Sequence, residues 1–158
     1  MASKVSGDAQ VPHRVGTKAP WHLWLVGGFA AVFNGIGAYD YVMTRSHDAV
    51  YFEQLGYGAA KIAYFEHYPA LPAVFWTVGV FGAVAASALV LFRSRHAVPV
   101  ALVALCAQAG LDIISFGFMD RLSVFGVRQS LFDVLVPLGL AAVLFGYALM
   151  MSRRGVLH

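Results

Sequence analysis

Polar side chains inside long apolar stretches are the residues of this chain that could do chemistry. Gln108 and Asp112 are four residues apart, a spacing that brings both side chains to one face of a helix. Asn34 and Thr77 lie within two other apolar stretches, and Asp40 lies between two tyrosines near the end of the first. A carboxylate beside amides and a hydroxyl could bind a small polar ligand, accept a proton, or hydrogen-bond one helix to another.

Asp112 is the most informative of these residues. A carboxylate at the centre of a bilayer costs about 2.5–3.5 kcal/mol even on a lenient insertion scale, so Asp112 is expected to face the bundle interior. Two interpretations stay open: an outward-facing polar pocket centred on Asp112, or an interhelical hydrogen bond that only joins helices. Counting residues from the predicted helix ends places Asn34, Thr77 and Asp112 at one level, with Asp40 nearer the surface.

Four apolar stretches must position these residues. They cover residues 21–43, 70–92, 97–119 and 132–151, and each has about the twenty residues that a helix needs to cross ~30 Å of hydrocarbon. Hydrophobic residues make up 59% of the chain and charged residues 12%, a balance outside that of soluble globular domains. The sequence therefore predicts an all-α fold, a bundle of four transmembrane helices.

The segments outside these stretches complete the domain prediction. Residues 1–19 are polar and predict a mobile tail, the membrane domain covers residues 20–152, and residues 153–158 form a second tail. In the long first loop, residues 44–69, apolar side chains recur near helical spacing and predict one short amphipathic helix on the membrane surface or over the bundle. Asp133 lies at the predicted start of the fourth helix, where the helix dipole stabilises a carboxylate. We therefore expect Asp133 to have a structural role.

Lysine and arginine residues indicate the orientation of the chain. Seven lie in the two tails and the second loop, and four lie in the first and third loops. Because cytoplasmic loops carry an excess of these residues, both termini are predicted to be cytoplasmic. The bilayer itself is then the first expected partner, and the basic residues do not indicate nucleic acid because they lie where phospholipid head groups would be.

Small residues recur every four positions on three of the predicted helices. The rows are Gly27, Ala31 and Gly35; Gly79, Ala83 and Ser87; and Ala142 and Gly146. In lipid, close backbone approach stabilises helix contacts, so these rows predict tight packing within the bundle. The same rows could also continue into a second copy of the chain or a larger membrane complex.

Signatures of catalysis and of metal binding do not occur in the sequence. It contains no nucleophile elbow, no phosphate-binding loop and no paired histidine motif, and its histidines lie near helix ends or in loops. Cys106, the only cysteine, is predicted to be a small buried side chain. We expect no enzyme activity, no metal and no cofactor.

Several stretches resemble a known family of small membrane proteins. They are Asn34–Thr44, Tyr64, Tyr68–Ala70, Trp76, Gly79–Gly82, Leu89–Arg93 and Ala97–Pro99. The chain looks like the small four-helix inner-membrane proteins of bacteria whose members are often labelled sugar transporters or hypothetical membrane proteins. The resemblance implies the four-helix architecture and the bacterial inner membrane, and it supplies no substrate-binding residues.

Three functions are compatible with these observations. The first is a non-enzymatic accessory or scaffold protein that acts through helix–helix contacts. The second is a small oligomeric transporter of a polar solute, with Asp112, Gln108, Asn34, Thr77 and Asp40 as its ligand-binding residues. The third is a redox or quinone-linked membrane protein that uses the aromatic residues and histidines.

Overall fold

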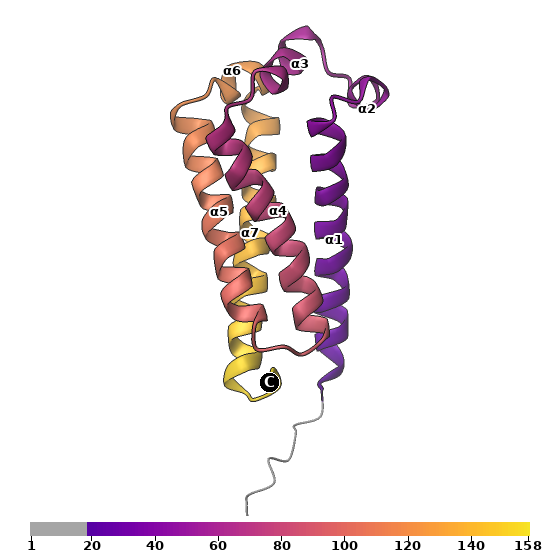
Figure 1. The fold of residues 1–158 in the computed structure, drawn as a ribbon, viewed down its shortest axis with the longest axis vertical. Helices are drawn as coiled ribbons and strands as arrows, with labels where there is room; N and C mark the ends of the chain where they lie inside the picture. The colour runs from indigo at the N-terminus through magenta and orange to yellow at the C-terminus, as the bar shows by residue number, and fades with distance from the viewer. Residues whose placement is uncertain (1–18) are drawn as a thin grey trace, which may run out of the picture.

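The fold consists of long antiparallel helices with a cap of short helices at one end (Figure 1). The computed structural model describes residues 19–158, so all of the predicted N-terminal tail except Ala19 lies outside the described residues. The long helices are α1 (Trp21–Arg45), α4 (Ala70–Leu91), α5 (Ala97–Gly117) and α7 (Val127–Arg153). The short helices of the cap are α2 (Ala49–Gln54), α3 (Ala59–Glu66) and α6 (Arg121–Phe125).

Local sequence explains where the helices begin and turn. Prolines precede α1 and α4, and their fixed φ suits the residue before a first helical turn. The Asp48 carboxylate accepts the Tyr51 backbone N–H at 2.7 Å and caps α2. Gly126 has a φ of +77°, a left-handed conformation that glycine adopts without strain, and it lets the chain turn from α6 directly into α7.

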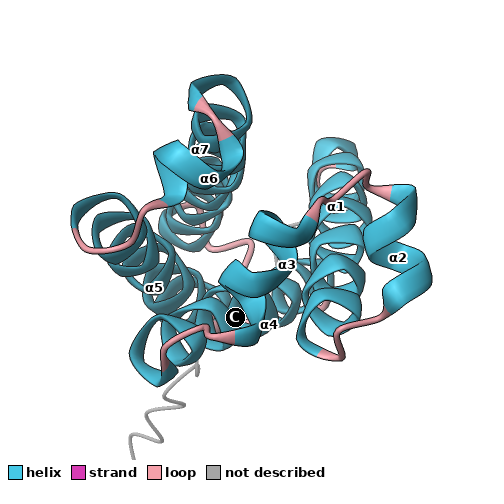
Figure 2. Ribbon diagram, turned by 90° about the horizontal axis from the view of Figure 1, so that it is seen from above, coloured by secondary structure: helices cyan, strands magenta, loops and turns pink. Residues whose placement is uncertain are grey.

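The long helices pack in a row that does not close (Figure 2). Helix α4 packs against both α1 and α5, and α7 packs against α5. Helices α1 and α7 meet near the end of the molecule where the chain terminates, and there His22 Nδ1 lies 2.7 Å from the Tyr147 hydroxyl. Further along, the two helices line opposite sides of a groove.

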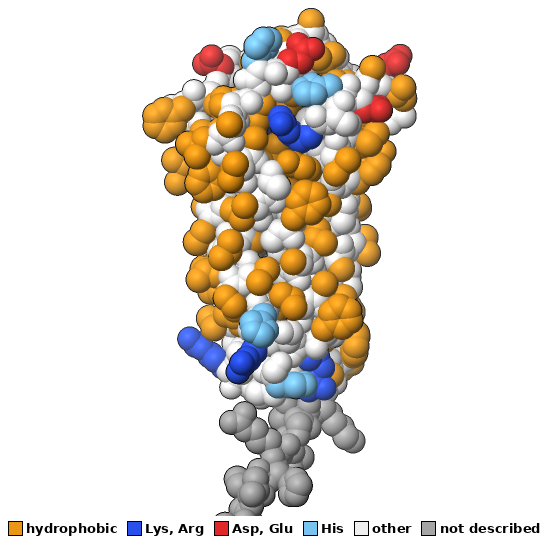
Figure 3. All heavy atoms as spheres, in the orientation of Figure 1, with side chains coloured by type: hydrophobic (Ala, Val, Ile, Leu, Met, Phe, Trp, Pro, Cys, Tyr) orange, Lys and Arg blue, Asp and Glu red, His pale blue; other side chains and the backbone are white. Residues whose placement is uncertain are grey.

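Within residues 19–158, three helices are long and apolar enough to cross a membrane: α4, α5 and α7. This supports a multi-pass membrane protein. Helix α1 is as long, but Asn34, Asp40 and its polar ends lower its hydropathy. Length and hydropathy therefore support three of the four predicted spans. Apolar side chains cover the middle of the visible face, and charged groups lie towards both ends (Figure 3).

The end where the chain terminates is closed by small aliphatic side chains. Ala86, Val90, Ala97 and Ala148 are inaccessible to solvent there, as is Leu23 of α1. The residues after α7 are not a free tail, because Val156 and Leu157 are buried in the same core. The backbone N–H of His158 donates to the Arg93 carbonyl at 2.8 Å and fixes this return.

The opposite end is covered by an aromatic cap. Phe52, Phe65 and Phe125, from α2, α3 and α6, form its buried centre. The first loop was predicted to hold one amphipathic helix, and the structure has two. Gly56, with a φ of +65°, and Gly58 interrupt the helical pattern between them. Helix α6 in the third loop was not predicted.

Candidate functional site

A cavity of about 240 Å³ lies inside the bundle, directly beneath the aromatic cap. All four long helices contribute to its wall, and residues of the cap close it from above. Its polar and charged lining residues are Asn34, Asp40, Thr44, Tyr57, Tyr68, Gln108, Asp112, Ser115, Arg121 and Asp133. Four of the five predicted binding residues therefore share one cavity, and Thr77 is the exception.

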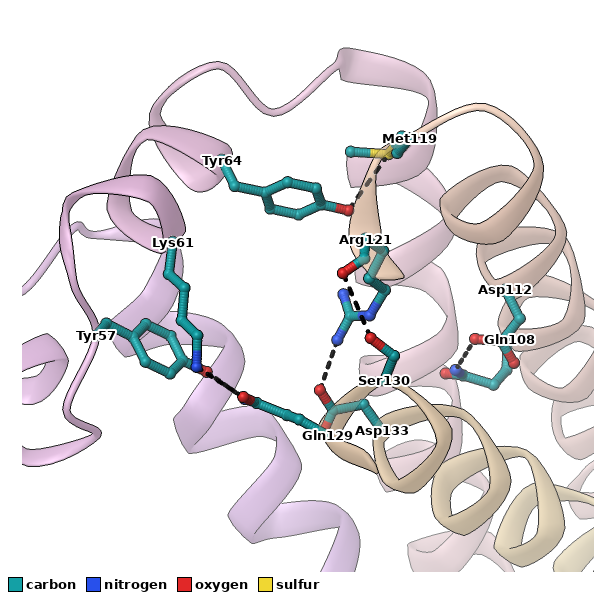
Figure 4. A network of polar contacts seen from close by, with 10 residues as sticks. All are labelled: Tyr57, Lys61, Tyr64, Gln108, Asp112, Met119, Arg121, Gln129, Ser130 and Asp133. Carbon is teal, nitrogen blue, oxygen red and sulfur yellow. Dashed lines mark hydrogen bonds and ion pairs between the residues drawn. The ribbon is translucent and has the colours of Figure 1, made fainter. Parts of the chain in front are cut away.

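Helix α5 supplies the wall with incompletely satisfied polar groups. Gln108 Nε2 donates to Asp112 Oδ1 at 3.0 Å, as expected for side chains one turn apart (Figure 4). Asp112 Oδ2 is buried and has no hydrogen-bond partner. The same holds for Ser115 Oγ, on a side chain that is only 3% exposed. Buried polar atoms are normally hydrogen-bonded, so two such atoms in one cavity indicate a position that a polar ligand or a water molecule can complete.

The facing wall carries an ion pair between α6 and α7. Arg121 Nη2 donates to Asp133 Oδ2 at 2.7 Å, and both residues line the cavity (Figure 4). The interpretation of Asp133 as a first-turn residue was wrong, because α7 begins at Val127 and Asp133 lies well within it. The Arg121 guanidinium, and not the helix dipole, positions the Asp133 carboxylate.

Asn34 and Thr77 join helices, and they do so at different heights. Asn34 Nδ2 donates to Ser87 Oγ at 2.9 Å, whereas the Thr77 hydroxyl lies 2.6 Å from that of Tyr41. Thr77 and Ser87 are about 15 Å apart along α4, so the expectation of one common level was wrong. The first turns of α4 extend past the predicted end of α1, and counting residues from the helix ends misplaced the pair.

Asp40 connects the cavity to the cap. The Tyr51 hydroxyl donates to Asp40 Oδ1 at 2.6 Å, which joins α1 to α2. Burial, and secondly the bond to this carboxylate, raise the pKa of Tyr51. Burial also raises the pKa of Tyr57 and raises that of Tyr68 to about 12. These phenols therefore keep their protons well above neutral pH, and Tyr51 uses its own to bond Asp40.

Lys61 closes the rim of the cap. Its Nζ donates to Gln129 Oε1 at 2.8 Å and lies 4.9 Å from the centre of the Tyr57 ring (Figure 4). Gln129 Nε2 in turn donates to the Tyr57 hydroxyl at 3.3 Å. These contacts connect α3 to α7 across the cavity and hold the cap over the bundle.

An apolar groove continues from the cavity between α1 and α7. It has a volume of about 180 Å³ and is lined by Leu25, Val26, Phe29, Ala30, Leu140, Val143 and Leu144, together with two residues of the cavity itself. Those two shared residues are Phe33 and Asn34. The polar cavity and the apolar groove therefore adjoin each other at these two side chains.

Cys106 and the small residues gave mixed outcomes. Cys106 is exposed on α5, so its predicted burial was wrong. A Cβ on Gly27 would lie 2.7 Å from Leu91 Cδ2, and one on Gly79 would lie 3.5 Å from the backbone nitrogen of Gln108. Both glycines therefore serve packing within the bundle. A Cβ on Gly35 or Gly146 would have no atom within 4 Å, so these two glycines do not serve packing within the bundle.

Comparisons with models of known families, with characterised proteins and with solved structures find no match. The resemblance to four-helix inner-membrane proteins therefore stays a prediction. Within residues 19–158 no three His, Cys, Asp or Glu side chains gather closely enough to hold a metal ion. The cavity's three carboxylates thus lie on separate walls, not at one point.

The sequence missed Arg121 and the aromatic ceiling of the cavity. Arg121 lies in a loop by hydropathy, and only its position twelve residues before Asp133 connects the two oppositely charged side chains. The density of aromatic residues between Tyr51 and Trp76 was the available signal for the ceiling. So many aromatic rings in one loop can be buried only by packing against each other or against the bundle.

Proposed function

We propose that the protein is an integral membrane protein with four spans, α1 included. The polar side chains of α1 face its neighbours: Asn34 bonds Ser87, and Tyr41 bonds Thr77. Its outward face is apolar, with exposed Leu25, Phe29, Val32, Ile36 and Tyr39. A helix with this distribution can lie in lipid despite its lower hydropathy, because only the outward face meets the acyl chains.

The distribution of basic residues supports an orientation with both termini cytoplasmic, and the resemblance alone suggests the bacterial inner membrane. Arg93, Arg95, Arg153 and Arg154 all lie at the end opposite the cap. Reporter fusions at residue 158 and in the α2–α3 turn would test this orientation. Cytoplasmic activity from the first and extracytoplasmic activity from the second is expected, and the reverse pattern would contradict it.

The non-enzymatic function that the geometry supports best is ligand binding within the bundle, as in a small transporter or a membrane receptor. The observation that carries it is the pair of buried, unpartnered atoms, Asp112 Oδ2 and Ser115 Oγ, in a cavity of about 240 Å³. Leaving a buried acceptor unsatisfied costs about 1–3 kcal/mol, which a bound hydrogen-bond donor would recover.

Fluorescence of Trp76, which lines the cavity, offers a direct test. The other two tryptophans are exposed at the far end of α1, so the W21F/W24F variant in nanodiscs reports on the cavity alone. A panel of small amines, guanidinium, alcohols and sugars should contain compounds that change this fluorescence saturably. Asp112→Asn should weaken that response, and Glu66→Gln, on an exposed cap residue, should not. A panel without any saturable response would refute ligand binding.

A second candidate is an accessory protein that acts through helix contacts. Ala142 and Gly146 lie on the exposed face of α7, where no residue within 19–158 covers them. A partner helix could approach closely there. Gly146→Leu should then abolish an oligomer or complex that is recovered from membranes, while Val143→Leu on the same helix should not. Equal recovery of the complex for both variants would argue against this role.

A further inference from the structure

We infer that the ligand is an amphipathic amine, with its protonated head in the cavity and its apolar chain in the groove between α1 and α7. This inference rests on the proposed ligand-binding function and adds the chemical class of the ligand. Charge, aromatic lining, and the position of the groove support it separately.

The cavity lining has an excess of acidic groups. Asp40, Asp112 and Asp133 line it, whereas Arg121 is the only cation among the residues that do. Arg121 is already paired with Asp133 at 2.7 Å. Lys61 lies at the rim and is engaged by Gln129. Asp112 therefore faces the cavity without a cationic partner, and an ammonium group would supply both a counter-charge and a donor for Oδ2.

Ser115 lies on the same face of α5 as Asp112, three residues along. Its side chain is 3% exposed and its Oγ is unpartnered. The Tyr64 and Tyr68 hydroxyls lie near the serine, and its proximity lowers the pKa that burial raises in each phenol. A primary ammonium has three N–H donors and can reach more than one such acceptor, which a quaternary ammonium cannot.

Aromatic rings form the ceiling above these acceptors. Tyr57, Phe65, Tyr68 and Trp76 line the cavity, and ring faces attract cations. The protein already uses this interaction nearby, since Lys61 Nζ lies 4.9 Å from the Tyr57 ring centre and Arg121 Cζ lies 4.9 Å from that of Phe125. The three carboxylates are spread over separate walls, an arrangement that suits an organic cation better than a metal ion.

The groove gives the ligand its apolar part. Its walls are almost wholly aliphatic and aromatic, and it joins the cavity at Phe33 and Asn34. Because α1 and α7 are not packed together along this stretch, the groove opens towards the acyl chains of a surrounding bilayer. An amphipathic molecule can thus reach the cavity sideways from the membrane, with its chain remaining in apolar surroundings throughout.

Four probes that share or lack each part of the ligand test this inference. Decylamine has both the charge and the chain, decan-1-ol has the chain alone, decanoate has the opposite charge, and ethylamine lacks the chain. With the W21F/W24F protein in nanodiscs, decylamine should bind at least about tenfold more tightly than any of the other three, measured by Trp76 fluorescence. Decan-1-ol or decanoate binding as tightly as decylamine would overturn the assignment of the head group.

Matched variants locate the two parts of the ligand. Asp112→Asn should weaken decylamine binding at least about tenfold, with Glu66→Gln unchanged. Val143→Phe fills the groove and should weaken decylamine several-fold while leaving ethylamine unaffected. Leu135→Phe, on an exposed position of the same helix outside the groove, should change neither. Circular dichroism establishes that each variant is folded. Equal effects of Val143→Phe and Leu135→Phe would overturn the placement of the chain.

The outcomes separate this inference from the function on which it rests. If ethylamine binds as tightly as decylamine, or if only uncharged members of the small-molecule panel bind, the amphipathic amine is wrong and ligand binding in the cavity stands. If no compound changes Trp76 fluorescence saturably, both proposals fail.

Discussion

The two ends of the bundle are built from side chains of different size, and the polar cavity lies at the end with the larger ones. Near the end of the chain, Ala86, Ala97, Ala101 and Ala148 allow the helices to approach closely around Leu23 and Met151. At the other end, rings from three short helices pack against each other over the bundle. A cavity of about 240 Å³ lies beneath those rings.

The difference shows how side-chain size decides where a helical bundle can hold a ligand. Small residues let backbones come together and leave no room between them. Large planar rings cover the bundle end without descending between the helices, so the polar groups of α5 and α7 remain in an enclosed space. The closed end therefore supplies rigidity, and the capped end supplies the candidate site.

Alkaline titration should give the largest difference in stability between the two ends. Unperturbed phenols ionise with a pKa of about 10, whereas burial raises that of Tyr68 to about 12 and also raises those of Tyr57 and Tyr64. The folded cap thus holds its protons more tightly than the unfolded cap. The part of the cap's stability that depends on protonated tyrosines is complete below pH 10 and is lost as the pH rises towards 12.

Near-ultraviolet circular dichroism and tyrosinate absorbance would follow this transition. The cap signal should disappear between those pH values while the helical signal of the long helices persists. Tyrosines that all ionise near pH 10, with an intact cap, would remove the distinction between the two ends.

Arg121→Ala should have the next largest effect. It leaves the Asp133 carboxylate without its partner in a partly buried position, at a cost of about 2 kcal/mol. Asp133→Asn in the same background should restore part of the loss, because it removes the stranded charge. Detergent-melting temperatures of the single and double variants would measure both changes. A double variant that is less stable than Arg121→Ala would contradict this account of the pair.

Adding a larger side chain to α7 at two positions tests the packing of the two ends directly. Ala148 is inaccessible in the closed end, so Ala148→Leu should overpack it and destabilise the fold by about 1–3 kcal/mol. Ala141, two turns earlier, lines the cavity, and Ala141→Leu should be nearly neutral. Thermal unfolding of both variants provides the measurement, and equal destabilisation would show that the cavity is not available space.

Tyr41→Phe should have the smallest effect. It removes the hydrogen bond to Thr77, and bonds of this kind between membrane helices average about 0.6 kcal/mol. Thr77 keeps its bond to the Ala73 carbonyl at 2.8 Å, so no donor is stranded. A loss of more than a few tenths of a kilocalorie beyond that average, measured by detergent melting, would mean that the contact does more than join α1 to α4.

Hydropathy and spacing predicted much of the fold because lipid imposes a simple pattern. The four long helices lie within a few residues of their predicted bounds, and α7 alone begins five residues early, at Val127 instead of residue 132. The predicted apolar stretch began only after the polar residues Arg128 and Gln129, although the hydrogen bonds of α7 already include them. The split of the first loop into α2 and α3 depends on the positive φ of Gly56, which periodicity does not reveal.

The site was predictable in part because one of its contacts is local. Gln108 and Asp112 are one helical turn apart, and that pair was found from spacing alone. The contacts of Arg121 with Asp133 and of Tyr51 with Asp40 depend on how loops fold over the bundle. Thr77 does not line the cavity, because the position of its side chain depends on the height of α4 relative to α1, and helix lengths alone do not determine this height.

Helix α1 is held at its two ends, by the His22–Tyr147 contact at one and by the bond between Asp40 and Tyr51 at the other. Between them its main packing partner is α4. If α1 spans the bilayer as proposed, lipid contacts its outward face while the groove separates it from α7 over this stretch. On the proposed four-span arrangement, the width of the opening between α1 and α7 should therefore depend on the thickness and chain packing of the surrounding lipid, and membrane composition would then affect access to the cavity.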